Sequence, residues 1–501
     1  MIALSPDRIP VIAGIGEVAD RPKDVAQSLE PAALMAEAAR RADAEAHGLL
    51  KEVDSLDIIA LVSWRYDDLC ALLSERLGIA PKRSFYGTVG GESPVRYLHE
   101  AAQRIALGTS AVGLIVGAEA QYAVNHAKRG GIALPWTPYA VNAPKMKRAA
   151  DYVHPLGHRM GVAWPVNVYP LYEAATAHAW GQAPREAQAE SALLWSRYSE
   201  AAARNPYSWS KAPLSPADIA AVTPDNRIIS WPYVKRMVAN PNVNQGAAII
   251  VTSLAKARAA GIADDRLVFI GAGASAAEPR DWLARDGYAQ NHAQTAVLEA
   301  MLAQVDRDAR RFDALELYSC FPVVPKMARR TLGLGEDVQP SVCGGLSFFG
   351  GPLNVYMAHA ACAMTRAIRD GAATGLIYGQ GEFVTKHHAL VLARQPQPGA
   401  PLHDARAQAI ADGRRGPIPP TDEAPSGAAT VESFTVLHDN GEPAQAVIVA
   451  MLDSGARTLA RVPASRRDEI AFLTAQDQYP IGARGRVAPD AEGLPEWRTS
   501  G

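Results

Sequence analysis

The chain has 501 residues, of which 48% are hydrophobic and 20% are charged, so it is long enough for roughly three domains. Its 50 Lys and Arg residues nearly balance its 52 Asp and Glu residues, which argues against a nucleic-acid-binding protein, because such proteins usually carry a basic excess. Only four cysteines are present, and no two have C-x-x-C spacing, which excludes a disulfide framework. Since no signal-peptide pattern and no apolar run of membrane-spanning length is found, we expect a soluble, cytoplasmic protein.

The first predicted elements alternate between short apolar strands and helices. Residues 10–17 and 55–62 are apolar and rich in β-branched side chains, as buried strands are, whereas residues 31–49 and 67–78 have helical spacing. This alternation is typical of an α/β protein in which helices cover a parallel sheet.

An internal repeat extends this pattern to a second half of the chain. Residues 101–117 (AAQRIALGTSAVGLIVG) and 360–379 (AACAMTRAIRDGAATGLIYG) both contain an Ala-rich helix, a Gly stop and a strand written Gly-Leu-Ile-x-Gly. Each copy follows a glycine-rich turn, at 90–94 and at 350–354. Because turn, helix and strand recur in the same order, we predict two similar α/β lobes; the spacing is far too long for a solenoid.

The remaining segments predict an insertion and an additional domain. Residues 428–480 contain alternating strands with a hairpin turn at Asp439–Glu442, which predicts a small all-β, barrel-like domain, and the polar last 20 residues are expected to fray. The predicted organisation is a first lobe at 1–255 with an insertion at about 120–235, a second lobe at 256–395, a Pro- and Gly-rich linker at 396–427, and the β domain with its tail at 428–501.

At this point the repeat resembles the thiolase superfamily. The resemblance rests on five segments in the family's order: Gly90–Gly117, Asn240–Ser253, Glu316–Phe321, Gly344–Pro352 and Gly375–Gly381. Together with the β domain, they resemble most the thiolase-like proteins of type 1, which are related to sterol-carrier-protein thiolases and often labelled acetyl-CoA acetyltransferases. The resemblance implies a thiolase fold with an extra C-terminal β domain.

The same resemblance places the catalytic groups of thiolases on residues that lack their chemistry. Thiolases need a cysteine thiolate as nucleophile, a histidine that activates it, a second cysteine as acid and base, and an oxyanion hole. The four corresponding positions fall on Gly91, Gly351, Ile377 and Tyr318. Glycine and isoleucine cannot transfer an acyl group or a proton, so Cys–His–Cys chemistry is not expected, and the fold alone does not carry the function.

Four residues near these positions have alternative interpretations. Glu92 is expected to stabilise the N-terminus of the following helix, or else to act as a general base in the former nucleophile pocket. Ser93 with Pro94 forms an ordinary helix start. Cys320 and Cys343 flank the predicted pocket and are candidate replacement thiols, although isolated cysteines are commonly small buried hydrophobic residues.

Two tyrosines at catalytic-loop positions are the remaining candidates. Tyr318 and Tyr378 would act as acid or base, or bind a carbonyl oxygen, unless they only pack in the pocket wall. Some thiolase-like proteins that pair with an OB-fold partner are aldolases acting on CoA thioesters and use tyrosines, so the resemblance also implies a retro-aldolase.

A basic cluster in the insertion predicts a nucleotide-binding surface, with a solvated basic face as the alternative. In thiolases this region covers the CoA nucleotide, whose phosphates favour Lys and Arg. The candidates for CoA binding are Lys145, Lys147, Arg148, Lys211, Lys235 and Arg236, together with Phe321. His154 and His158 have i,i+4 spacing, but Pro155 and Gly157 argue against a helix, so no metal site is expected.

Two classes of function follow from these observations. The first is an enzyme acting on an acyl-CoA thioester in lipid metabolism, nominally an acyltransferase, with retro-aldol cleavage as the alternative. The second is a non-catalytic protein that binds acyl-CoA or lipid. We expect no tightly bound cofactor, a CoA thioester as substrate or ligand, no nucleic-acid partner, no membrane span, and a monomer or homodimer.

Overall fold

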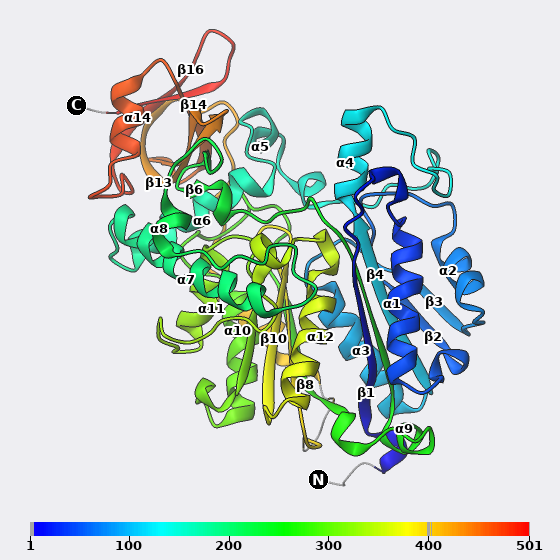
Figure 1. Ribbon diagram of the computed structural model, residues 1–501. Coiled ribbons are helices and arrows are strands. Elements are labelled where there is room, and N and C mark those ends of the chain that lie inside the picture. The colour runs from blue at the N-terminus through cyan, green and yellow to red at the C-terminus, as the bar shows by residue number, and fades with distance from the viewer. Residues whose placement is uncertain (1–4, 398–400, 402, 500–501) are drawn as a thin grey trace.

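The structure is a computed structural model that describes residues 5–397, 401 and 403–499. One large mixed sheet with its helices forms most of the molecule, and a second, smaller sheet lies at one end of it (Figure 1). None of the described helices is long and apolar enough to cross a membrane.

The first lobe alternates strands and helices over its first 120 residues, and one further strand and helix follow the insertion. Its elements are β1 (Pro10–Ala19), α1 (Pro31–Glu45), β2 (Ser55–Ile58), α2 (Leu69–Leu77), β3 (Arg83–Tyr86), α3 (Ser93–Leu107), β4 (Val112–Ala120), β7 (Asn244–Ser253) and α9 (Leu254–Ala259). The insertion contains α4 (Gln121–Gly130), α5 (Pro155–Arg159), α6 (Pro165–Ala179), α7 (Pro184–Arg204), α8 (Pro216–Ala220), β5 (Ile228–Ser230) and β6 (Tyr233–Val234).

The second lobe repeats this plan without a comparable insertion. Its elements are β8 (Val268–Ala277), α10 (His292–Leu302), β9 (Ala314–Leu317), α11 (Val323–Thr331), α12 (Tyr356–Arg369), β10 (Thr374–Gly381) and β11 (Lys386–Ala393). The expected linker contains β12 (His403–Asp404), which pairs with β8, and α13 (Arg406–Arg414), which packs on α10. This segment therefore packs on the second lobe as well as connecting two domains.

The strand order confirms the duplication predicted from the sequence. The large sheet runs β3-β2-β4-β7-β1-β8-β11-β10-β9, so β2-β4-β7-β1 in the first lobe corresponds to β9-β10-β11-β8 in the second. The two halves meet where β1 and β8 pair antiparallel through Val11–Phe269 and Ile12–Val268. In both halves one parallel pair is followed by two antiparallel pairs.

The expectation of a wholly parallel sheet is wrong. β10 and β11 are joined by only four residues, and so short a connection forces antiparallel pairing, because a parallel pair needs a long crossover. Helix α3 contacts strands of both halves and packs on α12, so these two helices occupy the centre of the molecule, whereas α1 covers β1, β4 and β7 from the other side (Figure 1).

The C-terminal sheet closes into a five-stranded barrel, which confirms the predicted barrel-like domain. Its elements are β13 (Gly427–Asp439), β14 (Glu442–Leu452), β15 (Arg457–Pro463), α14 (Arg467–Leu473), β16 (Arg484–Pro489) and β17 (Pro495–Thr499). The ring runs β13-β14-β15-β17-β16 and returns to β13. The helix α14 lies between β15 and β16 in the chain, so the domain is not composed of strands alone. The expectation of a frayed tail is wrong, because β16 and β17 pair with each other and Trp497 is buried.

The insertion of the first lobe joins the barrel to the rest of the molecule. Strand β5 pairs with β13 through Ser230 and Leu437, and the ring of Trp231 stacks on Phe434 with centroids 5.0 Å apart. α6 packs on β13 as well (Figure 1). The insertion and the C-terminal domain are thus one continuous structure although more than 190 residues separate them in sequence.

Arg457 ties the barrel to the second lobe. Its guanidinium is fully buried, pairs with both carboxylate oxygens of Glu432 at 2.6 and 2.7 Å, and donates to the carbonyl oxygens of Leu283 and Arg285. A buried charge that is paired and hydrogen-bonded in this way is stable only while every partner remains in place.

We predict that Arg457→Met lowers the free energy of unfolding by about 3–5 kcal/mol, because Glu432 and two carbonyl groups lose their charged partner inside the protein. The matched control is Arg484→Met in the same barrel, whose exposed pair with Asp453 should contribute at most about 1 kcal/mol. Urea unfolding followed by circular dichroism measures both. Equal midpoints for the two variants would contradict the anchoring role of Arg457.

Candidate functional site

An apolar cavity of about 450 Å³ lies where the N-terminus of α3, the ends of β9 and β10, and the insertion meet. Six residues that the sequence singled out line it: Gly91, Arg148, Tyr318, Cys320, Phe321 and Gly351. The other lining residues are Val62, Val89, Gly90, Ala149, Ala150, Trp164–Val166, Tyr169, Val238, Ala239, Pro241, Leu346, Leu353, Asn354 and Gln380–Glu382. The segments that resemble thiolase loops therefore meet around one cavity.

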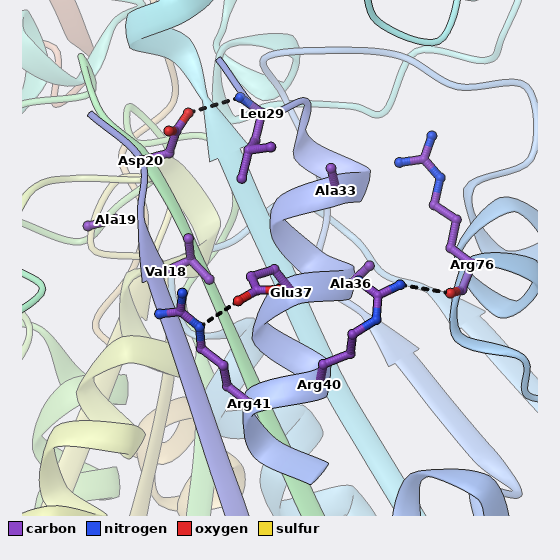
Figure 2. Close-up of a pocket in the computed structure, with 10 residues that line it drawn as sticks. All are labelled: Val18, Ala19, Asp20, Leu29, Ala33, Ala36, Glu37, Arg40, Arg41 and Arg76. Atoms are coloured by element: carbon purple, nitrogen blue, oxygen red, sulfur yellow. Dashed lines mark hydrogen bonds and ion pairs between the residues drawn. The ribbon is translucent and has the colours of Figure 1, made fainter. Parts of the chain in front are cut away.

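A different hollow lies on the outer side of the first lobe, between the end of β1, α1 and Arg76 (Figure 2). Its polar groups bind one another: Arg40 donates to the carbonyl oxygen of Arg76, Arg41 pairs with Glu37, and Asp20 accepts from the backbone of Leu29 (Figure 2). None of the residues predicted to act in the site lines this hollow.

The phenol of Tyr318 fills the space that a side chain at residue 91 would need. A Cβ atom placed on Gly91 would lie nearer than 3.0 Å to the hydroxyl oxygen of Tyr318 and to the carbonyl oxygen of Gln380. Real Cβ atoms do not approach other atoms this closely, so residue 91 must be glycine in this arrangement. The space beside Gly91 is therefore occupied by a tyrosine from another segment of the chain.

The hydroxyl of Tyr318 faces the cavity with its hydrogen-bonding capacity unused. It forms no hydrogen bond with any residue that the structure describes, and the ring packs edge-on against Tyr356 with centroids 6.1 Å apart. Burial raises the pKa of Tyr318 well above 10, and the nearby Cys320 and Glu92 act in the same direction. The group is thus a neutral hydrogen-bond donor over the physiological pH range.

Cys320 lines the same cavity but lacks the properties of a nucleophile. Burial raises the pKa of its thiol to about 12, and its sulfur lies 3.9 Å from Oε1 of Gln380. Because only the thiolate is strongly nucleophilic, Cys320 is a wall residue in this state. Phe321 stacks on Tyr169 with centroids 4.4 Å apart and forms part of the apolar wall.

Glu92 lies directly behind the cavity wall. Its Oε1 is 3.0 Å from Nζ of Lys386, whereas its buried Oε2 has no hydrogen-bond partner among the described residues. Cβ atoms on Gly90 or Gly381, which both line the cavity, would clash with this Oε2. Glu92 does not cap α3 through its side chain, so the expected helix-capping role is limited to the charge near the helix N-terminus.

Besides Glu92, four residues near the predicted catalytic positions lie outside the cavity. Tyr378 is buried on β10, where its hydroxyl hydrogen-bonds Gln294 and Nδ1 of His387. Ile377 is fully buried within the sheet, and Cys343 is fully buried, with burial raising the pKa of its thiol well above 9. Ser93 is the first residue of α3, but it does not cap the helix, because its hydroxyl donates to the carbonyl oxygen of Gly90 and accepts no backbone N–H of the first turn.

Several cavity residues were not found from the sequence. Tyr169 on α6 hydrogen-bonds Gln380 at 2.8 Å, and Glu382 is held by Arg280 and Lys386. Glu382 and Val384 have positive φ angles of 61° and 51°, which is uncommon for residues other than glycine. These residues directly follow segment 375–381, which resembles a catalytic loop of thiolases. Their position in the sequence is the signal that could have identified this turn as part of the site.

A second, positively charged cavity of about 560 Å³ adjoins the apolar one. Val62, Val89 and Arg148 line both cavities, and Lys145, Lys147 and Arg65 line the second. No carboxylate of a described residue lies within ion-pair distance of these four cationic side chains, and Asp151 instead accepts from the backbone of Arg148. Unpaired positive charge beside an apolar cavity favours an anionic ligand with an apolar part.

The other basic candidates lie elsewhere. Lys211 donates to the carbonyl oxygen of Asn205, and Arg236 donates to that of Asp218. Neither of these residues nor Lys235 lines the apolar or the charged cavity. The basic cluster in the sequence is therefore divided, and only its 145–148 segment faces the candidate site.

Comparisons with known proteins agree with this architecture. The family model described as "Thiolase-like protein type 1 additional C-terminal domain" matches residues 413–492. The crystal structure of a monomeric SCP2-thiolase like protein type 1 from Mycobacterium smegmatis is 26% identical, with a TM-score of 0.82, and the match covers 99% of this chain and 100% of that one. These findings confirm the predicted resemblance to thiolase-like proteins of type 1.

Two further solved structures share the thiolase fold at lower identity. The Ltp2-ChsH2(DUF35) aldolase is 18% identical over 78% of this chain and 98% of that chain, with a TM-score of 0.58. Human mitochondrial 3-ketoacyl-CoA thiolase is 13% identical over 78% of this chain and 100% of that chain, with a TM-score of 0.56. No protein with a curated description matches the sequence.

We predict that Gly91→Ala lowers the free energy of unfolding by about 1–3 kcal/mol, because the new methyl group overlaps the Tyr318 hydroxyl and the backbone of Gln380. Gly287→Ala is the control, since a Cβ atom there meets nothing within 4 Å. Thermal unfolding of the two variants and the parent measures the difference. A Gly91→Ala variant as stable as the control would show that Tyr318 does not occupy this space.

Proposed function

We propose that this protein binds an acyl-CoA thioester and cleaves it by a retro-aldol reaction rather than transferring its acyl group, with Tyr318 as a neutral hydrogen-bond donor to the thioester oxygen. The observation that carries the proposal is the unpartnered hydroxyl of Tyr318, which faces an apolar cavity at the place of the thiolase nucleophile.

The two adjoining cavities support a CoA thioester as the ligand. CoA combines a nucleotide with three phosphates and a long, largely uncharged arm that ends in the thioester. The charged cavity with Lys145, Lys147 and Arg148 suits the phosphates, and the apolar cavity suits the acyl group, with Arg148 at their boundary. The thioester would then lie beside Tyr318, and the acyl group would extend along the apolar wall that includes Phe321.

Acyl transfer through a cysteine is disfavoured by the state of the thiols. Cys320 is the cysteine in the cavity wall, and its pKa of about 12 keeps it protonated at neutral pH. Cys343 is fully buried outside the cavity. An acyl-enzyme intermediate needs an accessible thiolate, so these residues do not replace the missing thiolase nucleophile.

A neutral tyrosine suits a reaction that develops charge on a thioester oxygen. In retro-aldol cleavage of a 3-hydroxyacyl-CoA, a base removes the hydroxyl proton, the Cα–Cβ bond breaks, and its electron pair moves to the thioester as an enolate. We assign the stabilising hydrogen bond to Tyr318, and the base to Glu92 acting through one water molecule, because its unpartnered Oε2 lies behind Gly90 and Gly381 and does not line the cavity. Protonation at Cα then gives the shortened acyl-CoA beside an aldehyde or ketone. One solved structure that shares the fold is described as an aldolase, which makes this reaction the first to test.

We predict that Tyr318→Phe lowers kcat at least about 100-fold on a cleaved 3-hydroxyacyl-CoA and changes the Kd for this thioester little, because the lost donor acts mainly on the developing oxyanion. Since the pKa of Tyr318 lies well above 10, its ionisation should not reduce the parent rate as the pH rises to 10. Product release across a panel of 3-hydroxyacyl-CoA thioesters measures kcat, and calorimetry measures Kd.

Tyr378→Phe is the matched control, because its hydroxyl is bound to Gln294 and His387 away from the cavity and kcat should stay within a few-fold of the parent. Thioester binding without any product from the panel would overturn the enzymatic proposal and favour a non-catalytic acyl-CoA carrier. A covalent acyl adduct found by mass spectrometry would instead establish acyl transfer.

We predict that Arg148→Gln raises the Kd for a CoA thioester about 10-fold, since a charge-assisted hydrogen bond to phosphate is lost from the boundary of the two cavities. Lys235→Gln is the charge-matched control outside both cavities and should leave the Kd unchanged. Calorimetric titrations at two salt concentrations provide the measurement. Equal affinities for both variants would place the CoA phosphates elsewhere.

A further inference from the structure

Three histidines from separate parts of the chain converge on one point outside the cavities. His99 lies on α3, His388 on β11 and His403 on β12, and one ring nitrogen of each lies within 4.8 Å of the other two. None of the three lines the apolar or the charged cavity. His99 follows Glu92 by seven residues on the same helix, which places it about 10 Å along α3 from the site.

The separation of two of these nitrogens fits metal coordination. Nδ1 of His99 is 3.0 Å from Nε2 of His388. Two nitrogens bound to a tetrahedral Zn²⁺ at 2.0–2.1 Å lie about 3.3 Å apart, so a small adjustment of the rings would let one metal replace the shared proton. The third ring, that of His403, has its centroid 5.5 Å from His99 and 6.0 Å from His388.

The other ring nitrogen of His99 has the contact that metal-binding histidines usually have. Nε2 of His99 lies 3.3 Å from the carbonyl oxygen of Pro401, and a hydrogen bond to this oxygen places the proton on Nε2. Nδ1 of His99 is then the unprotonated nitrogen, and it points toward His388. Outer hydrogen bonds of this type fix the tautomer and the orientation of metal ligands.

The imidazole of His388 is buried, and imidazole nitrogens are common ligands of zinc-class metals. Arg96 adds a positive charge to this region, and Glu100 lies 3.9 Å from it and offsets part of that charge.

We propose that His99, His388 and His403 form a binding site for one divalent transition-metal ion of the zinc class. Three imidazole ligands leave one position of a tetrahedral ion free, and because His403 is exposed this position is open to water. Bound metal would fasten β12, and with it the segment that leads to the barrel, to α3 and β11. The site is independent of the function proposed for the cavities.

The test is a calorimetric titration of the chelator-treated full-length protein with ZnCl₂. We expect one equivalent of Zn²⁺ per chain, a rise in the melting temperature with Zn²⁺ concentration, and tetrahedral absorption bands when Co²⁺ replaces Zn²⁺. His403→Ala should weaken Zn²⁺ binding by at least about 10-fold. Because His403 is exposed, this variant is expected to fold.

His178→Ala is the control, since this exposed histidine on α6 lies outside the cluster and its loss should leave Zn²⁺ affinity unchanged. Negligible Zn²⁺ uptake by the parent protein would overturn the proposal. Equal Zn²⁺ affinity in the parent and in His403→Ala would overturn it as well, since the metal would then bind without this ligand. None of these readouts depends on turnover of a CoA thioester.

Discussion

The close approach of the N-terminus of α3 to the end of β10 determines the geometry of the candidate site. A Cβ atom on Gly379 would touch the backbone of Glu92, and one on Gly381 would overlap its carboxylate. Glycine at these positions lets α3 of the first lobe reach β10 of the second. Gly90 and Gly91, in the turn before α3, also lack the side chains that would keep the helix N-terminus away from the second lobe. The apolar cavity forms at this contact between the two lobes.

Within this geometry, the absence of a side chain at residue 91 makes room for Tyr318. Residue 91 is glycine, and the volume beside it holds the phenol of Tyr318, which comes from the segment after β9. Burial raises the pKa of this hydroxyl, so it presents a neutral donor to the cavity. The physical consequence is a site suited to stabilising developing negative charge on a ligand and poorly suited to forming a covalent intermediate.

The insertion and the C-terminal barrel form a second structural unit above this site. Strand β5 extends the barrel sheet, and α6 packs on β13 while it contributes Tyr169 to the cavity wall. The buried guanidinium of Arg457 joins the barrel to backbone carbonyls of the second lobe. The barrel thus supports the elements that cover the cavity, although its own strands do not line it.

The sequence by itself determined the fold class, the duplicated lobes and the barrel-like domain, because apolar periodicity and recurring glycine turns are local properties of the chain. It also identified the loops of the cavity, including Gly91 and Tyr318. The tertiary structure decided the rest. The four-residue turn between β10 and β11 makes these two strands antiparallel. The burial of Trp497 in the closed barrel gives the C-terminal segment a defined structure. Tyr378 and Gln380 are two residues apart on β10, so their side chains point to the same side of the sheet, and their positions along the strand place only Gln380 in the cavity wall. The histidine cluster joins positions 99, 388 and 403, which no spacing motif connects, because contacts between distant segments depend on how the sheet and helices pack.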